Sequence, residues 1–466
     1  MDRLALADVL SATGGKFLSG RKQSYVTGVS TDTRSTAEGE IFFAINGENH
    51  DGHAFVSQAI DKGAVGAVIS NMNGIADLLR GKQGTCSLIK VEDTRKALGD
   101  LARFYRKNLP GRFIAITGSN GKTTTKDMVY HLLRNFKKVT RSKNSFNNDI
   151  GVPLTIFETS SSHDFGVIEM GTNAPGEIKR LSEIISPDYT ILTNISHTHL
   201  EGLGDIKGVA DAKAEFIENM DEKGTLITNT DDNWCRQISR RFCGKVVGYG
   251  FGEDALIRAS NVKRNESGFE FTVNDSFPVA VKIMGKHNIY NALAAIALCF
   301  SIGIPLEELC DKFEGFTPPP MRMEKQIYGD IVIINDGYNS SPLSMLVAIE
   351  EFAQLQVPGR RVLVCGDMLE LGEKSEELHR EIGEKVAQSH IDNLWTIGPY
   401  SRLIAQEAII KGMARENIQS CENSEEMCSL VASLIRKNDT VLIKGSRKMK
   451  LEAVSHQIEQ FSQSKK

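Results

Sequence analysis

The chain has 466 residues, of which 41% are hydrophobic and 24% are charged, and its formal net charge is −4. This length exceeds what one hydrophobic core serves, so we expect about three domains. The composition is that of an ordinary globular protein, and the near-neutral charge offers no basic surface for nucleic acid.

Residues 1–108 alternate short predicted strands and helices. Strands are expected at 40–45 and 64–69, and a helix at 54–62 that ends before Gly63. A further helix at 94–107 runs into Asn108-Leu109-Pro110-Gly111, which is typical of a domain boundary. We therefore predict a first, smaller α/β domain over residues 1–108.

A glycine-rich loop follows the boundary. The buried strand 112–117 leads into Gly118-Ser119-Asn120-Gly121-Lys122-Thr123-Thr124, and an apolar helical face begins soon after. Such a turn directs backbone N–H groups and the positive end of the helix dipole at one point, which suits a phosphate. Lys122 adds a charge for the β- and γ-phosphates, and the Thr123 hydroxyl can ligate Mg²⁺. The loop is shorter than the common P-loop, because Ile116 stands where the first glycine would be. The strand before it and the helix after it nevertheless favour a nucleoside triphosphate site rather than a chance Gly-Lys-Thr in an ordinary turn.

The rhythm of strands and helices continues to the end of the chain. Alternation with helices predicts a doubly wound parallel sheet with strands at 112–117, 165–170, 189–195 and 224–228. Short alternating strands at 240–283 precede a buried helix at 289–303. The apolar run there, 292–304, has about 13 residues against the roughly 20 needed to cross a bilayer, so no membrane insertion is expected.

A proline-rich linker, Thr317-Pro318-Pro319-Pro320, separates this central P-loop ATPase domain, residues 109–317, from a Rossmann-like α/β domain, residues 318–466. The last domain should contain strands at 331–335, 361–365, 393–397 and 440–444. The eight cysteines are scattered without a Cys-x-x-Cys pair, which favours reduced thiols in a cytoplasmic protein over a disulfide framework or a zinc site.

Chemically active side chains fall at predicted strand ends, where parallel sheets bind ligands. Glu169 ends one strand, and the segment 193–201, with His197 and His199, follows the next. A carboxylate and an imidazole beside a triphosphate are candidate Mg²⁺ ligands. Because Mg²⁺ prefers oxygen, a histidine implies a special second site. Either residue alone is as often an ordinary loop side chain.

Other candidates have bland alternatives. Lys213 lies on a predicted helix, where a lysine is usually a solvated charge. Asn288 and Asn291 open the buried helix and suit either capping or an adenine edge. Asp336 ends a strand and could hold a ribose, and Lys444-Gly445-Ser446-Arg447 forms a second candidate anion site.

These stretches together resemble the Mur ligases of bacterial cell-wall synthesis across nearly the whole chain. The Asp-Asn-Pro motif of the member that adds the third stem residue is absent, and the third-domain motifs look like those of the branch that adds D-alanyl-D-alanine. Two positions depart from the family pattern: Met321 replaces the usual glycine, and Ser340-Ser341 follow Tyr-Asn where alanine or asparagine is usual. The matching segments are 31–34, 39–47, 51–53, 117–124, 144–153, 169–178, 335–342, 366–372 and 444–447.

The resemblance implies roles for particular residues. The family's magnesium histidine falls on His199, which precedes Leu-Glu-Gly, and its carbamoylated lysine falls on Lys213. The implied catalytic residues are Lys122, Glu169, His199 and Lys213, and the implied metal ligands are Thr123, Glu169, His199 and carbamoylated Lys213. The implied ATP contacts are Gly118, Ser119, Asn120, Gly121, Lys122, Thr123, Thr124, Asn288, Asn291, Arg322 and Asp336. The implied substrate contacts are Thr33, Arg34, Asn46, Asn144, Asn147, Asn148, Tyr338, Asn339, Lys444, Ser446 and Arg447.

The resemblance further implies an ATP- and Mg²⁺-dependent ligase that joins D-alanyl-D-alanine to UDP-N-acetylmuramoyl-tripeptide through an acyl phosphate. The first domain would bind the UDP-muramyl substrate, and we expect a cytoplasmic monomer. Whether the third stem residue is diaminopimelate or lysine stays open. Folylpolyglutamate synthase is a rival that the segments 31–47 and 173–177 disfavour. A nucleotide-driven switch or transport ATPase is a second rival, which leaves the third domain unexplained.

Overall fold

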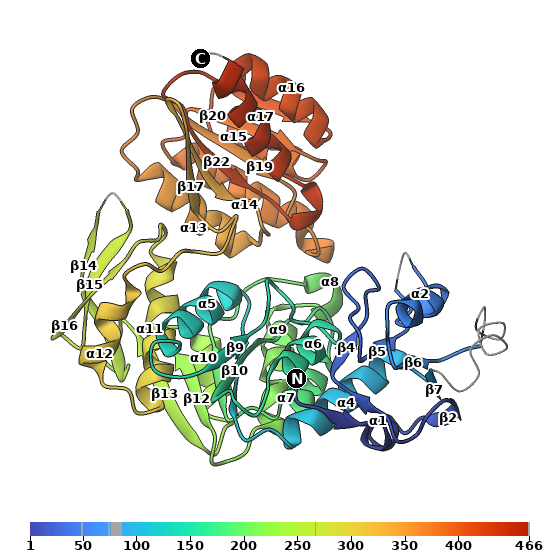
Figure 1. Ribbon diagram of the computed structural model, residues 1–466. Helices are drawn as coiled ribbons and strands as arrows, with labels where there is room; N and C mark the ends of the chain where they lie inside the picture. Colours follow the sequence, from blue (N-terminus) through green and yellow to red (C-terminus); the bar gives the residue numbers. More distant parts are fainter. Residues whose placement is uncertain (48–49, 73–74, 76–85, 266, 465–466) are drawn as a thin grey trace.

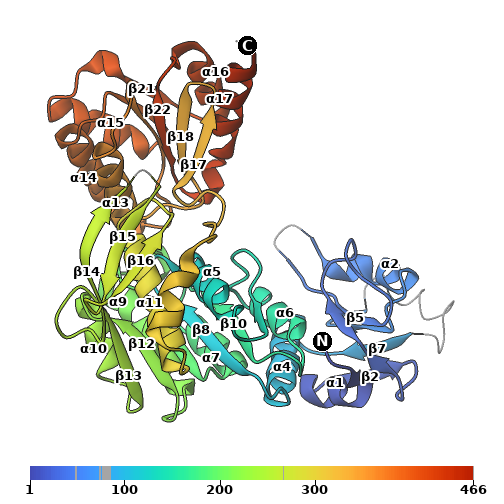
Figure 2. The ribbon, with the colours of Figure 1, turned by 60° about the vertical axis from the view of Figure 1, so that its left-hand side comes forward.

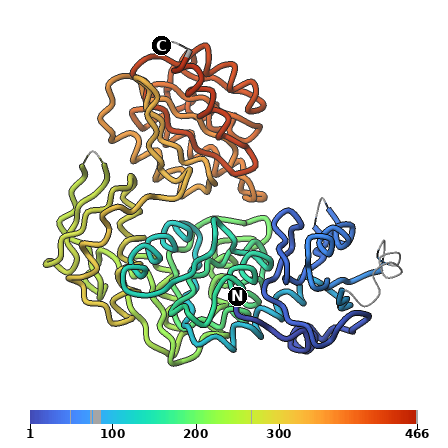
Figure 3. The backbone as a smooth tube through the Cα atoms, in the orientation of Figure 1, coloured from blue at the N-terminus to red at the C-terminus, as the bar shows by residue number. Residues whose placement is uncertain are grey.

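The computed structural model describes residues 1–47, 50–72, 75, 86–265 and 267–464. It contains three α/β domains, each built on its own sheet, which the chain visits in sequence order (Figures 1 and 3). The central domain lies between the other two, with the C-terminal domain above it in Figure 1 and the N-terminal domain at its side. The expected three-domain α/β class is therefore confirmed.

The N-terminal sheet has the strand order β2-β7-β6-β5-β4. Its strands are β2 (Lys16–Ser19), β4 (Gly28–Ser30), β5 (Glu40–Phe43), β6 (Gly66–Ile69) and β7 (Ser87–Lys90), of which only β2 runs antiparallel to its neighbour. A small separate pair joins β1 (Leu4–Ala5) to β3 (Tyr25–Val26). The helices include α1 (Leu6–Thr13), α2 (Val56–Asp61) and α4 (Thr94–Lys107). The Asp93 carboxylate accepts hydrogen bonds from the first backbone N–H groups of α4, which fixes where that helix begins.

The central sheet has nine strands in the order β16-β15-β14-β13-β12-β11-β8-β10-β9. They are β8 (Arg112–Thr117), β9 (Val139–Arg141), β10 (Phe165–Glu169), β11 (Tyr189–Leu192), β12 (Thr225–Asn229), β13 (Lys245–Gly250), β14 (Ile257–Arg264), β15 (Phe269–Val273) and β16 (Phe277–Val281). Strands β8 to β14 pair in parallel, and β15 and β16 add an antiparallel extension.

Helices cover both faces of the central sheet, because side chains alternate between its faces along β8. Phe113 and Ala115 pack into one core with α6 (Gly151–Glu158) and α7 (Glu177–Ile185). Ile114 and Ile116 pack into the other, with α5 (Lys122–Leu133) and α11 (His287–Ser301). The sheet is therefore doubly wound. The remaining helices of this domain are α8 (Leu200–Leu203), α9 (Ile206–Ala214), α10 (Asn233–Ser239) and α12 (Leu306–Cys310).

The C-terminal sheet has the order β17-β18-β22-β19-β20-β21, with β17 as its antiparallel edge. Its strands are β17 (Glu324–Tyr328), β18 (Ile331–Asp336), β19 (Arg361–Gly366), β20 (Asn393–Ile397), β21 (Ile418–Cys421) and β22 (Thr440–Lys444). Its helices are α13 (Pro342–Ala353), α14 (Ser375–Gln388), α15 (Ser401–Ile410), α16 (Ser424–Leu434) and α17 (Glu452–Ser464).

Differences from the sequence prediction are local. The strand predicted at 189–195 ends at Leu192, and the hydroxyl of the next residue, Thr193, donates a hydrogen bond to the Asn120 carbonyl, 2.6 Å away. The strand predicted at 40–45 ends at Phe43, and the helix predicted at 289–303 runs from His287 to Ser301. Each large sheet lies within one predicted domain, and the boundaries at 108 and 317 stay predictions.

The central and C-terminal domains also touch away from the cleft between them. Figure 2 shows the hairpin of β14 and β15 extending toward α13. There the buried Glu351 carboxylate of α13 pairs with Arg264 of β14 and accepts a hydrogen bond from the Lys286 N–H at 2.9 Å. The contact anchors the start of α11 to the C-terminal domain.

Two further properties concern the whole described chain. Among the described residues, no helix is both long and apolar enough to span a bilayer. None of the eight cysteines forms a disulfide; Cys243 is exposed, Cys428 is half-buried, and the other six are buried.

Candidate active site

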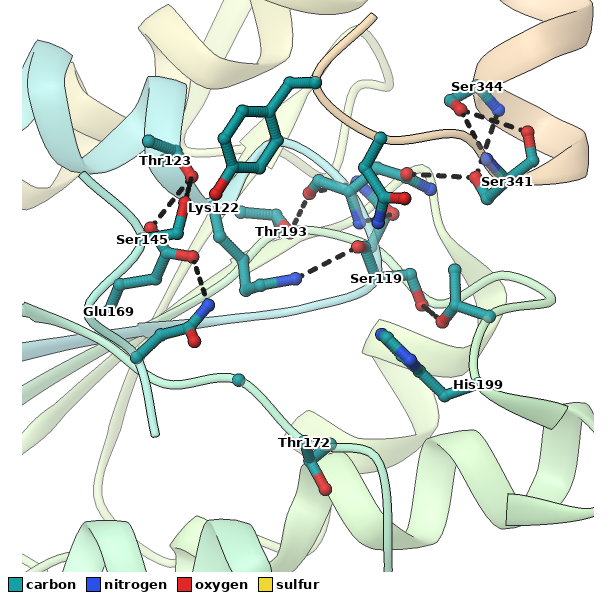
Figure 4. Close-up of a pocket in the computed structure, with 18 of the residues that line it drawn as sticks. Ser119, Lys122, Thr123, Ser145, Glu169, Thr172, Thr193, His199, Ser341 and Ser344 are labelled. Atoms are coloured by element: carbon teal, nitrogen blue, oxygen red, sulfur yellow. Dashed lines mark hydrogen bonds between the residues drawn. The ribbon is translucent and has the colours of Figure 1, made fainter. Parts of the chain in front are cut away.

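A cleft of about 1390 Å³ lies where the carboxyl ends of the central strands face those of the C-terminal sheet. Its walls come from the loops after β8, β10 and β11 on one side and after β18 and β22 on the other, with Arg95 of α4 at one end. Figure 4 shows ten labelled residues of this pocket. A carboxyl-end crevice of this kind is where open parallel sheets bind ligands.

The glycine-rich loop forms the floor of the cleft. Gly118 and Gly121 have φ of +137° and +82°, which favour glycine. A Cβ at Gly118 would lie 2.0 Å from Thr193 Oγ1, and one at Gly121 would lie 2.4 Å from Asn291 Oδ1. No larger residue therefore fits at either position without moving its neighbours. The expected strand, glycine turn and helix are all present.

Lys122 bends over its own loop. Its ammonium donates hydrogen bonds to the Gly118 and Ser119 carbonyls at 2.9 and 3.1 Å. Burial lowers the pKa of Lys122, the Glu169 carboxylate opposes that change, and the Arg322 charge adds to it. The group is thus a poorly solvated cation that an anion would stabilise.

Glu169 is the centre of an oxygen-rich cluster beside this lysine. Its carboxylate is 1% exposed and accepts hydrogen bonds from Thr123 Oγ1 at 2.9 Å and Asn147 Nδ2 at 2.8 Å. Carboxylate and hydroxyl oxygens suit Mg²⁺, so Thr123 and Glu169 fit the expected ion. Among the described residues, however, no three His, Cys, Asp or Glu side chains lie close enough together to hold a metal by themselves.

His199 also lines the cleft, whereas His197 does not line it. His199 has a left-handed backbone, φ +53°, immediately before α8. Its Nδ1 lies 2.5 Å from Glu370 Oε2 of the C-terminal domain. The hydrogen bond with His199 lowers the pKa of Glu370, so this carboxyl is charged at neutral pH.

Lys213 lies on α9, behind the cleft surface rather than on it. The side chain is 0% exposed, and its Nζ has no hydrogen-bond partner. Burial, together with the positive charge of Lys122, lowers the pKa of Lys213 well below its usual value. The reading of Lys213 as a solvated surface lysine is therefore wrong, because the residue is completely enclosed.

The predicted ATP contacts at α11 come together with the glycine loop. Asn291 accepts a hydrogen bond from Thr125 Oγ1 at 3.2 Å and donates to Asn288 Oδ1 at 2.8 Å. Arg322 stacks on the Tyr338 ring, 4.3 Å from its centroid, and donates to Thr123 Oγ1 at 3.1 Å. The C-terminal domain thus places a cation beside the loop.

The predicted residues of the C-terminal domain form a second cluster. Lys444, which is 2% exposed, donates to Asp336 Oδ2 at 2.6 Å and to the Asn339 carbonyl at 3.2 Å. Ser446 and Arg447 line the cleft beside them, and Arg447 also pairs with Glu452 at 3.0 Å. Both Asp336 carboxylate oxygens have partners, because Oδ1 accepts a hydrogen bond from the Met323 N–H at 3.1 Å.

Some predicted substrate residues lie elsewhere. Thr33, Arg34 and Asn46 belong to the N-terminal domain and do not line this cleft; Arg34, with a side chain 90% exposed, pairs with Asp32. Asn144 is outside the lining too, and its carbonyl accepts a hydrogen bond from Lys126 Nζ at 2.6 Å. Asn147 and Asn148 of the same segment do line the cleft.

Sequence reasoning missed two residues that join the walls. Ser341 donates a hydrogen bond across the cleft to Asn120 Oδ1 at 3.1 Å, and Glu370 pairs with His199. Both stand in segments with family-like motifs. Their roles depend on domain packing, which no local pattern reports.

Comparison with known proteins identifies the group to which this arrangement belongs. Three family profiles match: Mur ligase family, catalytic domain, at 25–106; Mur ligase middle domain at 116–299; and Mur ligase, glutamate ligase domain, at 321–447. A curated relative, the UDP-N-acetylmuramoyl-tripeptide--D-alanyl-D-alanine ligase of Bacillus subtilis, is 36% identical over 93% of this chain and 93% of its own. This chain belongs to the Mur ligase family.

Solved structures of Mur ligases agree. MurF from Acinetobacter baumannii superposes with a TM-score of 0.87 at 26% identity, over 99% of both chains. MurF from Thermotoga maritima, in complex with ADP, superposes with a TM-score of 0.80 at 27% identity, over 94% of this chain and 98% of its own. A folylpolyglutamate synthase of Mycobacterium tuberculosis shares the fold alone, at 15% identity. As a Mur ligase, the chain is an ATP-dependent enzyme that forms amide bonds, and the folylpolyglutamate synthase alternative is not supported.

The departure from the family pattern at Met321 has a backbone cost. Met321 has φ +58°, a left-handed conformation that glycine adopts more readily than any other residue. Glycine at this position would relieve about 1–2 kcal/mol of backbone strain. Because glycine also increases the entropy of the unfolded chain, we expect Met321→Gly to raise the free energy of unfolding by only about 0.5–1 kcal/mol. Denaturant-induced unfolding of the C-terminal domain measures this change in free energy.

Met323 is a matched control, because it has a similar φ of +52° but is buried, with only 3% of the residue exposed. Met323→Gly relieves similar strain but removes buried surface worth about 2–5 kcal/mol, so it should destabilise. If Met321→Gly also lowers the free energy of unfolding, the contacts of the Met321 side chain contribute more to stability than its backbone strain costs.

Proposed function

We propose that this Mur ligase joins D-alanyl-D-alanine to UDP-N-acetylmuramoyl-tripeptide with hydrolysis of ATP to ADP and phosphate. The names of full-length relatives at 36% and 34% identity support this substrate pair. The observation that carries the proposal is the cleft itself, which sets the phosphate loop of one domain against the strand-end loops of another. Such a site can hold a nucleotide and two further reactants together.

The reaction has two displacements. The tripeptide carboxylate attacks the γ-phosphorus of ATP, giving an acyl phosphate and ADP. The amine of the dipeptide then attacks the acyl carbon; phosphate leaves, the amine loses a proton, and an amide remains. Lys122 and the backbone N–H groups of its loop stabilise the negative charge on the transferring phosphoryl group. Arg322, hydrogen-bonded to Thr123, would add a second cation from the C-terminal domain.

Exclusion of water protects the acyl phosphate. The hydrogen bonds from Ser341 to Asn120 and from Arg322 to Thr123 join the two walls directly over the glycine loop. A closed cleft both shields the intermediate and holds the amine near it, which supports a role for domain closure in the cycle.

Mg²⁺ would be held by Thr123 and Glu169 near the phosphates, with His199 and Lys213 contributing to a second site. Bound there, the ion would neutralise phosphate charge. We propose that Lys213 acts as a carbamate: its enclosed, partnerless amine has the lowered pKa that reaction with CO₂ requires, and a carbamate would attract Lys122 where an ammonium repels it.

We assign the N-terminal domain, residues 1–108, to the UDP-muramyl end of the substrate, with Thr33, Arg34 and Asn46 as its contacts. Domains 109–317 and 318–466 would bind ATP and the amine. We expect a cytoplasmic monomer; eight cysteines without a disulfide among them are in keeping with a reducing compartment.

The amine substrate provides the test of this function. A site sized for a dipeptide gains contacts along its second residue and terminal carboxylate, for which Lys444 and Arg447 are the candidate cations. We expect product with D-alanyl-D-alanine and little with D-glutamate, L-lysine or diaminopimelate. Mass spectrometry measures the product, with the diaminopimelate-containing and the lysine-containing tripeptide each tested as the carboxylate substrate. Faster ligation of any free amino acid would contradict the assignment, and ATP turnover without both substrates would favour a switch ATPase.

A further inference from the structure

The contact between His199 and Glu370 joins two domains at one edge of the cleft. His199 Nδ1 lies 2.5 Å from Glu370 Oε2, and the Glu201 N–H donates to the Glu370 carbonyl at 3.2 Å. Figure 4 shows the His199 ring extending toward the part of the cleft where Lys122 lies. A side-chain pair and a backbone bond together therefore fix how the loop after β19 meets the start of α8.

Both members of this pair have unusual backbone conformations. His199 has φ +53° and Glu370 has φ +64°, values that residues other than glycine rarely adopt. The strain persists only because the surroundings impose it. Backbone strain of this kind is found most often at functional sites.

The loop that carries Glu370 is held rigidly from below. The Met368 N–H donates to His379 Nε2 at 3.0 Å, and the Leu369 N–H donates to Ser446 Oγ at 2.9 Å. The Asp367 carboxylate accepts from the Ser401 N–H at 2.7 Å. Because His379, Ser446 and Asp367 are all buried, these bonds restrict the position of Glu370 closely.

The chemistry of the pair depends on which nitrogen carries the proton. A carboxylate can only accept, so the donor of this pair is the His199 Nδ1–H, and Nε2 is the ring nitrogen that takes no part in it. An imidazole held in this way by a carboxylate is the usual form of a histidine that ligates a metal. The carboxylate also makes the imidazole a stronger electron donor.

We propose that Glu370 is a positioning residue that orients His199 toward Mg²⁺ when the C-terminal domain meets the central domain. The inference rests on the proposed function, in which His199 contributes to the second metal site. It means that the metal site is complete only in the closed arrangement, since one of its supports comes from the other domain.

Mn²⁺ in place of Mg²⁺ tests this inference without turnover. Pulsed electron paramagnetic resonance of Mn²⁺, bound with a non-hydrolysable ATP analogue and the tripeptide substrate, detects coupling to a histidine ¹⁴N nucleus. We expect the coupling in the wild type and its loss in Glu370→Gly, which removes the carboxylate but suits the backbone at φ +64°. The Mg²⁺ concentration for half-maximal ligation should rise about 10-fold or more in that variant, with kcat at saturating Mg²⁺ reduced less.

Two companion variants separate position from charge and from the loop. Glu370→Gln keeps an acceptor for Nδ1 and should retain the ¹⁴N coupling with a smaller rise in the Mg²⁺ requirement. Glu373→Gln changes an exposed glutamate three residues along and should match the wild type. The inference is overturned if the wild type has no ¹⁴N coupling, or if Glu370→Gly keeps both the coupling and the Mg²⁺ dependence. A wild type that couples to ¹⁴N but does not ligate the dipeptide would contradict the proposed function alone.

Discussion

Lys122→Ala should lower the ligation rate by about 10²-fold or more, which corresponds to about 2.7 kcal/mol of lost transition-state stabilisation. The Lys122 ammonium is the side-chain cation of the glycine loop, and in the structure its hydrogen bonds go to two carbonyls of that same loop. Neutral carbonyls do not balance the charge of this ammonium, and burial lowers its pKa. An anionic phosphate would supply the missing negative charge. Steady-state release of ADP and phosphate measures the effect.

The fold should survive the change, because Lys122 makes no contact on which another element depends for its position. Lys137, exposed just after α5, is the matched control, and Lys137→Ala should ligate at the wild-type rate. Near-normal turnover in Lys122→Ala, with unfolding unchanged, would mean that this loop is not the catalytic phosphate site.

Lys213→Ala should be nearly inactive, and short-chain carboxylates such as acetate or propionate should restore part of its activity. An uncharged lysine amine attacks CO₂ to give a carbamate and a proton, and the enclosed Lys213 amine is held in that reactive form by burial and by Lys122. The carbamate supplies the oxygen ligand that Mg²⁺ prefers. Removal of the side chain leaves space in which a free carboxylate can replace it.

Two variants control this experiment. Lys213→Met keeps most of the buried volume, so it should be inactive and should not respond to added carboxylates. Lys207 lies on the same helix with its side chain 70% exposed and paired with Asp211, and Lys207→Ala should behave as the wild type. If Lys213→Ala keeps most of its activity at limiting Mg²⁺, the second metal site must be built from other groups.

The sequence predicted the parts of this molecule that depend on local pattern. The strand at 112–117, the glycine turn and the helix after it follow from hydrophobic periodicity and from glycine, and the structure contains all three. The sequence also predicted the doubly wound sheet, because the alternation of strands and helices is visible in the same hydrophobic periodicity. The edge strands β9 and β17 were not predicted, because short edge strands carry only a weak alternation of buried and exposed residues.

Contacts between domains could not be predicted from pattern. Glu370 and Ser341 act on residues more than 170 positions away in the chain, and nothing in their own segments specifies the partner. Lys213 is the reverse case: its helix position suggested a solvated charge, and only packing reveals its enclosure. The resemblance to the family supplied that residue where physical pattern did not.

The distribution of the thiols makes this chain convenient for watching its domains move. A thiol reacts as its thiolate and only where reagents reach it, and burial raises the pKa of Cys235, Cys299 and Cys365. Cys243, on the central domain, is exposed, whereas Cys428 is half-buried and burial raises its pKa. A maleimide dye should therefore label Cys243 faster than the other cysteines, so that a single exposed cysteine introduced on the C-terminal domain completes a pair for measuring the distance between domains in solution.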